Sequence, residues 1–505
     1  MNSPIYSVCQ AVSSYLPRKC WPPYPLPHLS TSTTRSQPGS LAFLKWAPRK
    51  KMFSDLPDEC LANIFSKTMC SSASHDFEPP SSPFFSAECS QDPFLLGQVC
   101  RKWRNVALCT SELWCSITIV HPKPCQLHRV ELWLQRSGSH PISITLRQSS
   151  NPTVAEFNAT VALLSLFNSR AAFWQNLDFC FNGQFPHILL SRLQDLSEMR
   201  SCKLTKVNLT LRSHLPAPPL SQEWEALTIR FWDLLQSIPS ITSLEWNAPV
   251  VGSARLGNNV KAVDIKTQIS METLSKIIHS TVNLKSIIVH KLSLPSSYPL
   301  HVIKQTIYPN LTVLDITTTS SITSDISNLL KSITLPSLTC LTLAQVQHDI
   351  LVHVANLIHR SKCILEVFGI RIPNFTEPQI MEWLNMEELK HITCLILEGP
   401  ITNNILRALH RPAKYGHQSC YFPNLKCLGL GKCVPTIDNG LLLRMLGSRF
   451  WTPPYIAGPK LFATELELAC ITVQEVTAEH EAYAAMIKGS TEGSGRGMRE
   501  LEITV

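Results

Sequence analysis

Histidines and cysteines near residue 420 are the first candidates for chemistry, because these side chains are common zinc ligands. The group comprises His410, His417, Cys420, Cys427 and Cys433. Six, two, six and five residues separate successive members, so the short paired spacing of structural zinc sites is missing. The pattern does not predict a metal site.

A glycine-rich stretch, 429–432, resembles part of a phosphate-binding loop. It lacks the upstream glycine and the following Ser or Thr of that motif. GxSxG and HExxH motifs are also missing from the sequence, and no acid–base pair stands out. We therefore expect a chain that is not an enzyme, with no catalytic residues and no cofactor.

Composition narrows the class of protein further. Of 505 residues, 44% are hydrophobic and 16% charged, which is enough apolar material for a large core. No apolar run reaches the roughly 18 residues of a membrane span. The net charge is 45 − 37 = +8, of which residues 1–51 supply +7. Because the other residues carry only +1, we expect neither nucleic acid nor a membrane as partner.

The 18 cysteines include no CxxC pair, and the sequence opens without the apolar core of a secretory signal. Free thiols in a reducing compartment, cytoplasmic and/or nuclear, are the expectation. Residues 1–51 contain eight prolines and no acidic residue, which predicts a disordered tail. A transit peptide has a similar composition, but the prolines disfavour its helix. Met52 could be an alternative start.

A six-residue phrase, L-x-x-L-x-L with other apolar residues allowed, recurs along the chain. Its copies at 284, 311, 338, 365 and 392 follow one another every 27 residues, and a further copy starts at 425. Weaker copies start at 174, 241, 260, 463 and 498. Helix-like stretches, such as 270–281 and 376–388, lie between the copies. Each repeat is thus expected to contain one strand and one helix.

This pattern resembles the leucine-rich-repeat family, which implies a curved solenoid with a parallel sheet on its concave side. Strand alternation would bury Leu314 and Ile316 and expose Val313 and Asp315 on that side. The family's turn-bonding Asn or Cys is matched only by Cys433, so we expect poorly bonded turns. Cysteines 340, 394 and 427 share the third phrase position. Fifth-position residues predicted to contact a target are Glu245, Asp264, Ile288, Asp315, Thr342 and Ile396.

Two helical segments precede the repeats. In 53–67, Leu61, Ile64 and Phe65 share one helix face. An apolar stripe continues over 93–117, after a Ser/Pro-rich insert at 66–93 that is expected to loop out.

Together these segments resemble an F-box, through Leu56-Pro57-Asp58-Glu59 and the later Val99-Cys100-Arg101-Lys102-Trp103. The second phrase is close to that of mushroom-type fungal F-box families. The resemblance implies three helices that bind a Skp-family adaptor and, through it, a cullin–RING ubiquitin ligase. The candidate adaptor contacts are Leu56, Pro57, Ile64, Leu96, Val99, Cys100 and Trp103. The alternative is that these residues pack the box onto the solenoid; Trp103 and Trp114 are expected to be internal.

The expected fold is α/β: an N-terminal three-helix F-box, then an irregular leucine-rich-repeat solenoid with a parallel concave sheet. The expected divisions are a tail at 1–51, the F-box at 52–119, connecting strands and a helix at 120–170, and the solenoid at 171–505. We expect a substrate-recognition subunit of a cullin–RING ligase, which binds the adaptor through the box and an unknown protein target through the solenoid. A non-catalytic repeat scaffold without a ligase role is the alternative.

Overall fold

A computed structural model describes fifteen stretches of the chain. They are 56–70, 93–183, 186–193, 203–213, 222–248, 256–293, 305–318, 324–346, 349–371, 375–410, 421–434, 436–450, 465–473, 476–489 and 500–504. The expected tail at 1–51 and most of the expected insert at 66–93 lie outside these residues.

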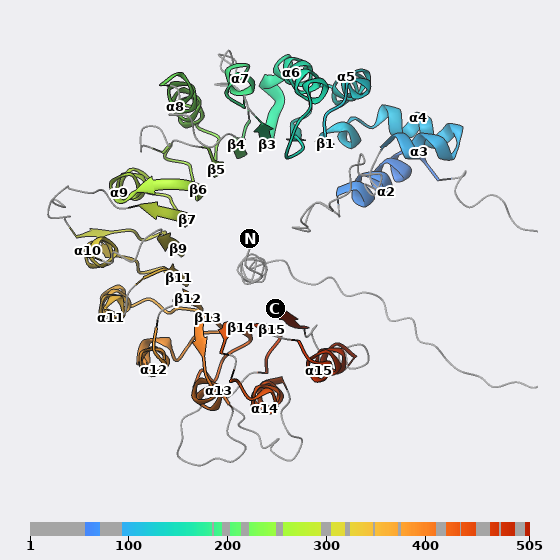
Figure 1. Cartoon of the computed structure of the whole chain (residues 1–505). Coiled ribbons are helices and arrows are strands. Elements are labelled where there is room, and N and C mark those ends of the chain that lie inside the picture. Colours follow the sequence, from blue (N-terminus) through green and yellow to red (C-terminus); the bar gives the residue numbers. More distant parts are fainter. Residues whose placement is uncertain are drawn as a thin grey trace, which may run out of the picture.

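Within the described residues, one 14-stranded parallel sheet runs through the protein, and its strands lie side by side in chain order. They line the inner side of an arc, and the helices lie along the outer side (Figure 1). The strands are β1 (Ser116–Val120), β2 (Ile142–Arg147), β3 (Trp174–Gly183), β4 (Lys206–Ser213), β5 (Ser243–Asn247), β6 (Ala262–Ser270), β7 (Ser286–Ser293), β9 (Val313–Thr318), β11 (Cys340–Ala344), β12 (Val367–Arg371), β13 (Cys394–Ile401), β14 (Cys427–Cys433), β15 (Leu468–Thr472) and β16 (Glu500–Thr504). Two short strands, β8 (Thr306–Ile307) and β10 (Ile333–Thr334), pair separately.

The first three described helices form one end of the arc, beside β1 (Figure 1). They are α2 (Asp58–Cys70), α3 (Pro93–Val99) and α4 (Arg101–Cys109). A short 3-10 helix, η1 (Ser111–Trp114), leads from them into β1. The helices that follow are α5 (Leu127–Ser137), α6 (Val154–Asn168), α7 (Pro186–Ser191), α8 (Gln222–Gln236), α9 (Met271–Ser280), α10 (Ser324–Ser332), α11 (Ile350–Ser361), α12 (Glu377–Leu384), α13 (Asn403–Leu409), α14 (Asn439–Phe450) and α15 (Ala478–Gly489). None of the helices in the described stretches combines the length and apolar character needed to cross a bilayer.

The strand register confirms the 27-residue spacing. Val313 pairs with Cys340, Cys340 with Val367, and Val367 with Cys394, each 27 residues further on. Leu314 and Ile316 are fully buried, as the alternation predicts, and Asp315 between them is half-buried. Each strand therefore turns its fourth and sixth phrase positions toward the helices. Burial of one such Leu or Ile stabilises the fold by about 1.5–3 kcal/mol.

The run of strand–helix units begins earlier than expected. β1 and β2 belong to the same sheet, so the segment 120–170 consists of units like those that follow and is not a separate connection. The weak copy expected at 463 was also placed wrongly. Leu468 pairs with Cys427, so that phrase starts at Leu466, three residues later.

The turns that lead into five of the strands are bonded by side chains at the position just before the phrase, which is not the position after the phrase on which the expectation of poorly bonded turns rests. The amides of Asn259, Asn283 and Asn310 donate to carbonyl oxygens of the preceding unit at 2.7, 2.9 and 3.2 Å. The hydroxyls of Ser240 and Ser337 do the same at 2.7 and 2.6 Å. These side chains tie five of the turns to the preceding unit.

Arginines at the ends of helices tie the outer side together. Arg449, which is fully buried, donates to the carbonyl oxygens of Leu409, Phe422 and Tyr421 at 2.8, 3.0 and 2.6 Å. Arg360, at the end of α11, donates in the same way to the carbonyl of Leu330 in α10 at 2.6 Å. Such bonds satisfy the free carbonyls at the C-terminus of the preceding helix.

Candidate functional site

The helical box, which comprises α2, α3, α4 and η1, has a small core of its own. Leu61 and Phe65 of α2 pack against Val106 of α4, and Trp114 of η1 is fully buried among them. The indole nitrogen of Trp114 donates to the carbonyl of Ala107 at 2.9 Å, so its polar atom is satisfied inside the core. The prediction that Trp114 is internal is confirmed.

The turn between α3 and α4 is fixed by two side chains. Cys100 is the N-cap residue of α4, and its sulfur accepts a hydrogen bond from the backbone nitrogen of Trp103 at 3.4 Å. Arg104 reaches back from α4 and donates to the carbonyl of Gly97 at 2.7 Å. Together these bonds hold the helices at a fixed angle, so the side chains on their outer faces are presented rigidly.

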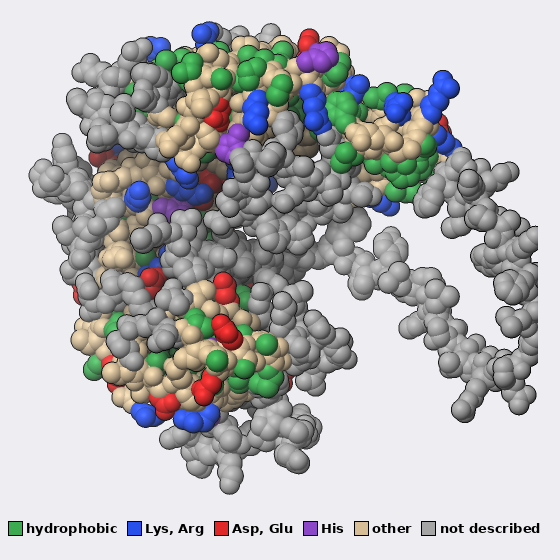
Figure 2. Space-filling view, turned by 45° about the vertical axis from the view of Figure 1, so that its right-hand side comes forward, with side chains coloured by type: hydrophobic (Ala, Val, Ile, Leu, Met, Phe, Trp, Pro, Cys, Tyr) green, Lys and Arg blue, Asp and Glu red, His purple; other side chains and the backbone are tan. Residues whose placement is uncertain are grey.

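Part of the predicted adaptor face is exposed apolar surface. Val99 and Ile64 expose 60% and 47% of their area, and Pro57 and Cys100 are also exposed. Leu56, Leu96 and Trp103 are half-buried and pack against the core of the box. Figure 2 shows hydrophobic side chains gathered over the box at the end of the arc.

Sequence reasoning missed Leu95, which is 44% exposed. Its spacing of four residues from Val99 in the same helix was the available signal, because such pairs share one face. We call Ile64, Leu95 and Val99 the exposed box face.

A different set of residues joins the box to the first strand–helix unit. Phe94, Trp114 and Trp133 of α5 meet edge to face, with ring centroids 5.0 Å apart for Phe94 and Trp114 and 5.2 Å for the two tryptophans. The guanidinium of Arg136 lies 4.6 Å from the centroid of Trp114. Packing onto the solenoid therefore uses these aromatic rings. It leaves Ile64 and Val99 exposed, contrary to the packing alternative for those two residues.

The concave side of the sheet carries a charged group over β5, β6 and β9. Glu245, Asp264 and Asp315 occupy fifth phrase positions, where Glu245 is the direct register partner of Asp264. Lys266 pairs with Glu245, and the Nε2 atom of His290 lies 2.8 Å from Asp264 Oδ1. The predicted Ile288 lies between Asp264 and Asp315 in the register. Four of the predicted target residues are thus brought together.

Burial shifts the pKa values of Asp264, Asp315 and His290. It raises the pKa of Asp264 to about 7, with Glu245 and Asp315 adding to the rise and Lys266 opposing it. Burial also raises the pKa of Asp315 to about 6, against the effect of Arg371. The pKa of His290 falls to about 4, mainly because burial disfavours the charged ring. Near neutral pH the His290 ring is therefore uncharged, and its contact with Asp264 is a hydrogen bond rather than an ion pair.

The other predicted target residues are not exposed, and the expectation is wrong for both. Thr342 and Ile396 keep only 3% and 1% of their area. Each packs against a glycine on the neighbouring strand, in space that a larger residue would fill. A Cβ added at Gly369 would lie 3.0 Å from Thr342, and one at Gly429 would lie 3.5 Å from Ile396. Over β11–β15 the concave side is a packed apolar strip, formed by Cys340, Val367, Cys394, Ile396, Cys427, Leu468 and Cys470.

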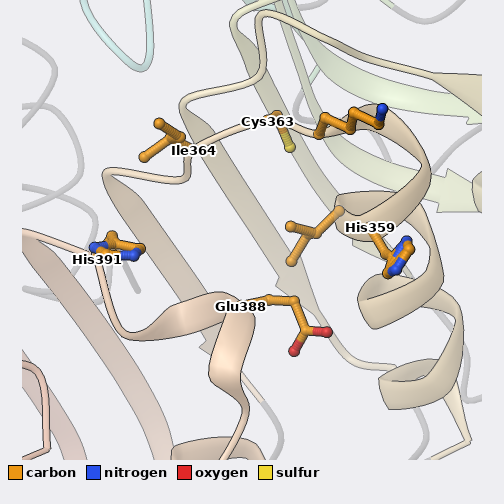
Figure 3. Close-up of a pocket in the computed structure, with 7 residues that line it drawn as sticks. His359, Cys363, Ile364, Glu388 and His391 are labelled. Atoms are coloured by element: carbon orange, nitrogen blue, oxygen red, sulfur yellow. The ribbon is translucent and has the colours of Figure 1, made fainter.

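A shallow pocket of about 360 Å³ lies between α11 and the 3-10 helix η5 (Glu387–Leu389). His359, Cys363, Glu388 and His391 line it, but Figure 3 shows His391 and Glu388 pointing to different sides. Nowhere in the described stretches do three or more His, Cys, Asp or Glu side chains form a group that could hold a metal. Of the histidine–cysteine group noted in the sequence, His417 and Cys420 lie outside the described residues.

Neither a protein-family model nor a curated protein matches the chain. The fold defines an α/β protein whose long parallel sheet is backed by helices, with a small helical box at one end.

Proposed function

We propose that the protein is the substrate-recognition subunit of a cullin–RING ubiquitin ligase, and that the exposed box face binds a Skp-family adaptor. The observation that carries this proposal is that different residues of the box contact the solenoid and face the solvent. Aromatic rings fix it to the solenoid, while Ile64, Leu95 and Val99 remain exposed. Exposed apolar side chains on a small helical unit with its own core are typical of a protein-binding surface. The F-box resemblance of the same residues names the partner.

In this proposal the box is an F-box and the repeats form a leucine-rich-repeat solenoid. The chain performs no bond chemistry of its own. It holds the target near a charged conjugating enzyme and so raises their effective concentration. The concave group Glu245, Asp264, Ile288 and Asp315 is the proposed contact with the target. Thr342 and Ile396 are withdrawn from that surface because they are buried.

The test is a titration of the full-length chain with a purified Skp-family adaptor. Val99→Asp places a charge on the most exposed residue of the exposed box face. We expect it to weaken binding by at least about 30-fold, the loss of about 2 kcal/mol typical of an interface hot spot. The matched control is Val352→Asp. Val352 lies on α11 and is 58% exposed, close to the 60% of Val99, but it is not part of the box.

Equal loss of binding in both variants, or no binding by the unaltered chain, would contradict the proposal. A second step separates the scaffold alternative, in which the adaptor binds but no ligase forms. Adaptor, cullin and RING subunit are mixed with the chain and a charged conjugating enzyme. Ubiquitin transfer to a captured target is expected, and an adaptor complex that excludes the cullin would favour the scaffold.

A further inference from the structure

Two cysteines face each other across neighbouring strands of the concave apolar strip. Cys394 of β13 and Cys427 of β14 are direct register partners and occupy the same phrase position. Parallel strands lie about 4.7–4.9 Å apart. That separation falls inside the range of about 4.4–6.8 Å between the Cα atoms of disulfide-bonded cysteines.

The curvature of the sheet brings these side chains closer than their backbones. Both cysteines belong to the concave strip, and β13 and β14 lie on the inner side of the arc (Figure 1). Side chains on the inner side of a bend converge, which moves the two Cβ atoms toward the roughly 3.5–4.5 Å of a disulfide. The Cys394 side chain also lies close enough to the Cys427 thiol to shift its pKa.

Reactivity differs between the two thiols. The Cys394 side chain lowers the pKa of the Cys427 thiol, which outweighs the opposing effects of burial and Glu467, and Lys426 adds to the lowering. Cys427 is half-buried and so reachable from solvent, whereas Cys394, beside it on the neighbouring strand, is buried. A reachable thiol with a lowered pKa is the one that reacts first, and the buried thiol is placed to attack it afterwards.

Other cysteines nearby lack this arrangement. Cys340 is separated from Cys394 by the whole of β12, and Cys470 is the register partner of Gly429. Cys433 lies on the same strand as Cys427 but is buried, and burial raises its pKa to about 12. Among the described cysteines, Cys394 and Cys427 are the pair that the strand register sets opposite each other.

We propose that Cys394 and Cys427 form a modification site, which hydrogen peroxide converts into a disulfide joining β13 to β14. In the first step the Cys427 thiolate attacks peroxide. An S–O bond forms, the O–O bond breaks, and the departing hydroxide takes a proton to become water. In the second step the Cys394 sulfur attacks Cys427. An S–S bond forms, the S–O bond breaks, and a second water leaves. Two thiols lose two electrons, one peroxide gains them, and a small thiol reductant reverses the change.

The site stands independently of the adaptor proposal, because its evidence lies wholly within the sheet. Its consequence is local: the bridge ties two strands of the concave side together and removes two thiol hydrogens from the apolar strip.

Mass spectrometry of the reduced, full-length, folded chain after peroxide treatment tests the proposal. Remaining thiols are alkylated in denaturant before digestion with trypsin. Cleavage after Lys and Arg places Cys394 in 391–407, Cys427 in 427–432 and Cys433 in 433–444, so the three thiols are read separately. The expected product is peptide 391–407 linked to 427–432, with Cys433 still alkylated. The same treatment in denaturant should instead spread the links over many of the 18 cysteines.

Two variants sharpen the result. Cys394→Ser should leave Cys427 as a sulfenic acid that dimedone traps, with no linked peptide. Cys340→Ser, on the same concave strip, should form the link as the unaltered chain does. The proposal is overturned if Cys427 links mainly to Cys340 or Cys470. It is equally overturned if both thiols stay reduced at a peroxide concentration that oxidises the exposed Cys60 and Cys100.

Discussion

Replacement of Asp264 by Asn should make the protein more stable, and only above a certain pH. Burial raises the pKa of Asp264 to about 7 from an ordinary 3.8, so the folded chain holds the proton more tightly than the unfolded chain. The stability that this proton confers is fully present below about pH 4 and is lost as the pH rises through about 7. Asn resembles the protonated acid in shape, and it can still hydrogen-bond to His290. The variant therefore keeps at high pH what the native carboxyl loses.

The size of the effect follows from the same pKa. A difference of about 3 pKa units corresponds to about 4 kcal/mol, since each unit is 1.36 kcal/mol. The Asp264 side chain keeps 26% of its exposure, so solvent screens part of this cost. We expect a gain of about 1–3 kcal/mol at about pH 8.5 and a gain near zero at about pH 4.

Thermal unfolding of both proteins, followed by circular dichroism over that pH range, measures the effect. The lowered pKa of His290 makes both chains less stable as the pH falls from about 6.5 to 4, so this contribution largely cancels in the difference between them. Asp178→Asn is the control. Asp178 is held by Arg147 at 2.6 Å, so its loss should not stabilise the chain at any pH. A pH-independent gain for the Asp264 variant, or a loss at high pH, would refute the reasoning.

Three further substitutions test how the units and the box are held. Arg449→Met should lower the free energy of unfolding by about 2–4 kcal/mol in denaturant titrations, because the carbonyls of Leu409 and Tyr421 lose a donor and that of Phe422 loses one of two; an unchanged midpoint would show that the bonds contribute nothing. Asn310→Ala should cost about 0.5–1.5 kcal/mol, the value of one hydrogen bond to the turn at Val282. Faster amide exchange should then appear at that turn and not at remote ones. Trp114→Ala should cost about 3–5 kcal/mol and release the box from α5, detected as early proteolysis near η1; cleavage elsewhere first would argue against the aromatic joint.

The spacing of 27 residues was enough to predict the strand register from β7 to β13. It succeeds there because every copy places large apolar residues at the fourth and sixth positions, and a slip would expose them. β1 and β2 were not counted among the repeats, although the register places their fourth positions at Ile117 and Ile144. The first position of β2 is Pro141, which breaks the phrase, whereas that of β1 is the apolar Trp114. The copy near 463 was placed three residues too early for a different reason. Leu466 fits the fourth position of a phrase that starts at 463 and also the first position of a phrase that starts at 466.

Exposure on the concave side could be predicted only in part. Asp264 and Asp315 were expected to be exposed there and are half-buried, whereas Thr342 and Ile396 are buried against Gly369 and Gly429 on neighbouring strands. That burial depends on glycines about 30 residues away, which a single phrase does not reveal. The side-chain hydrogen bonds of the turns before the strands were also not predicted, because the family's turn-bonding residue follows the phrase. The recurring Asn or Ser just before it was the usable signal.

The most direct measurement of the central claim is calorimetric titration of the full-length chain with a purified Skp-family adaptor, beside its Val99→Asp and Val352→Asp variants. The account predicts a one-to-one complex for the unaltered chain and for the α11 variant, and binding weakened by at least about 30-fold for the box variant. No heat of binding from the unaltered chain, or equal affinities in all three proteins, would contradict it.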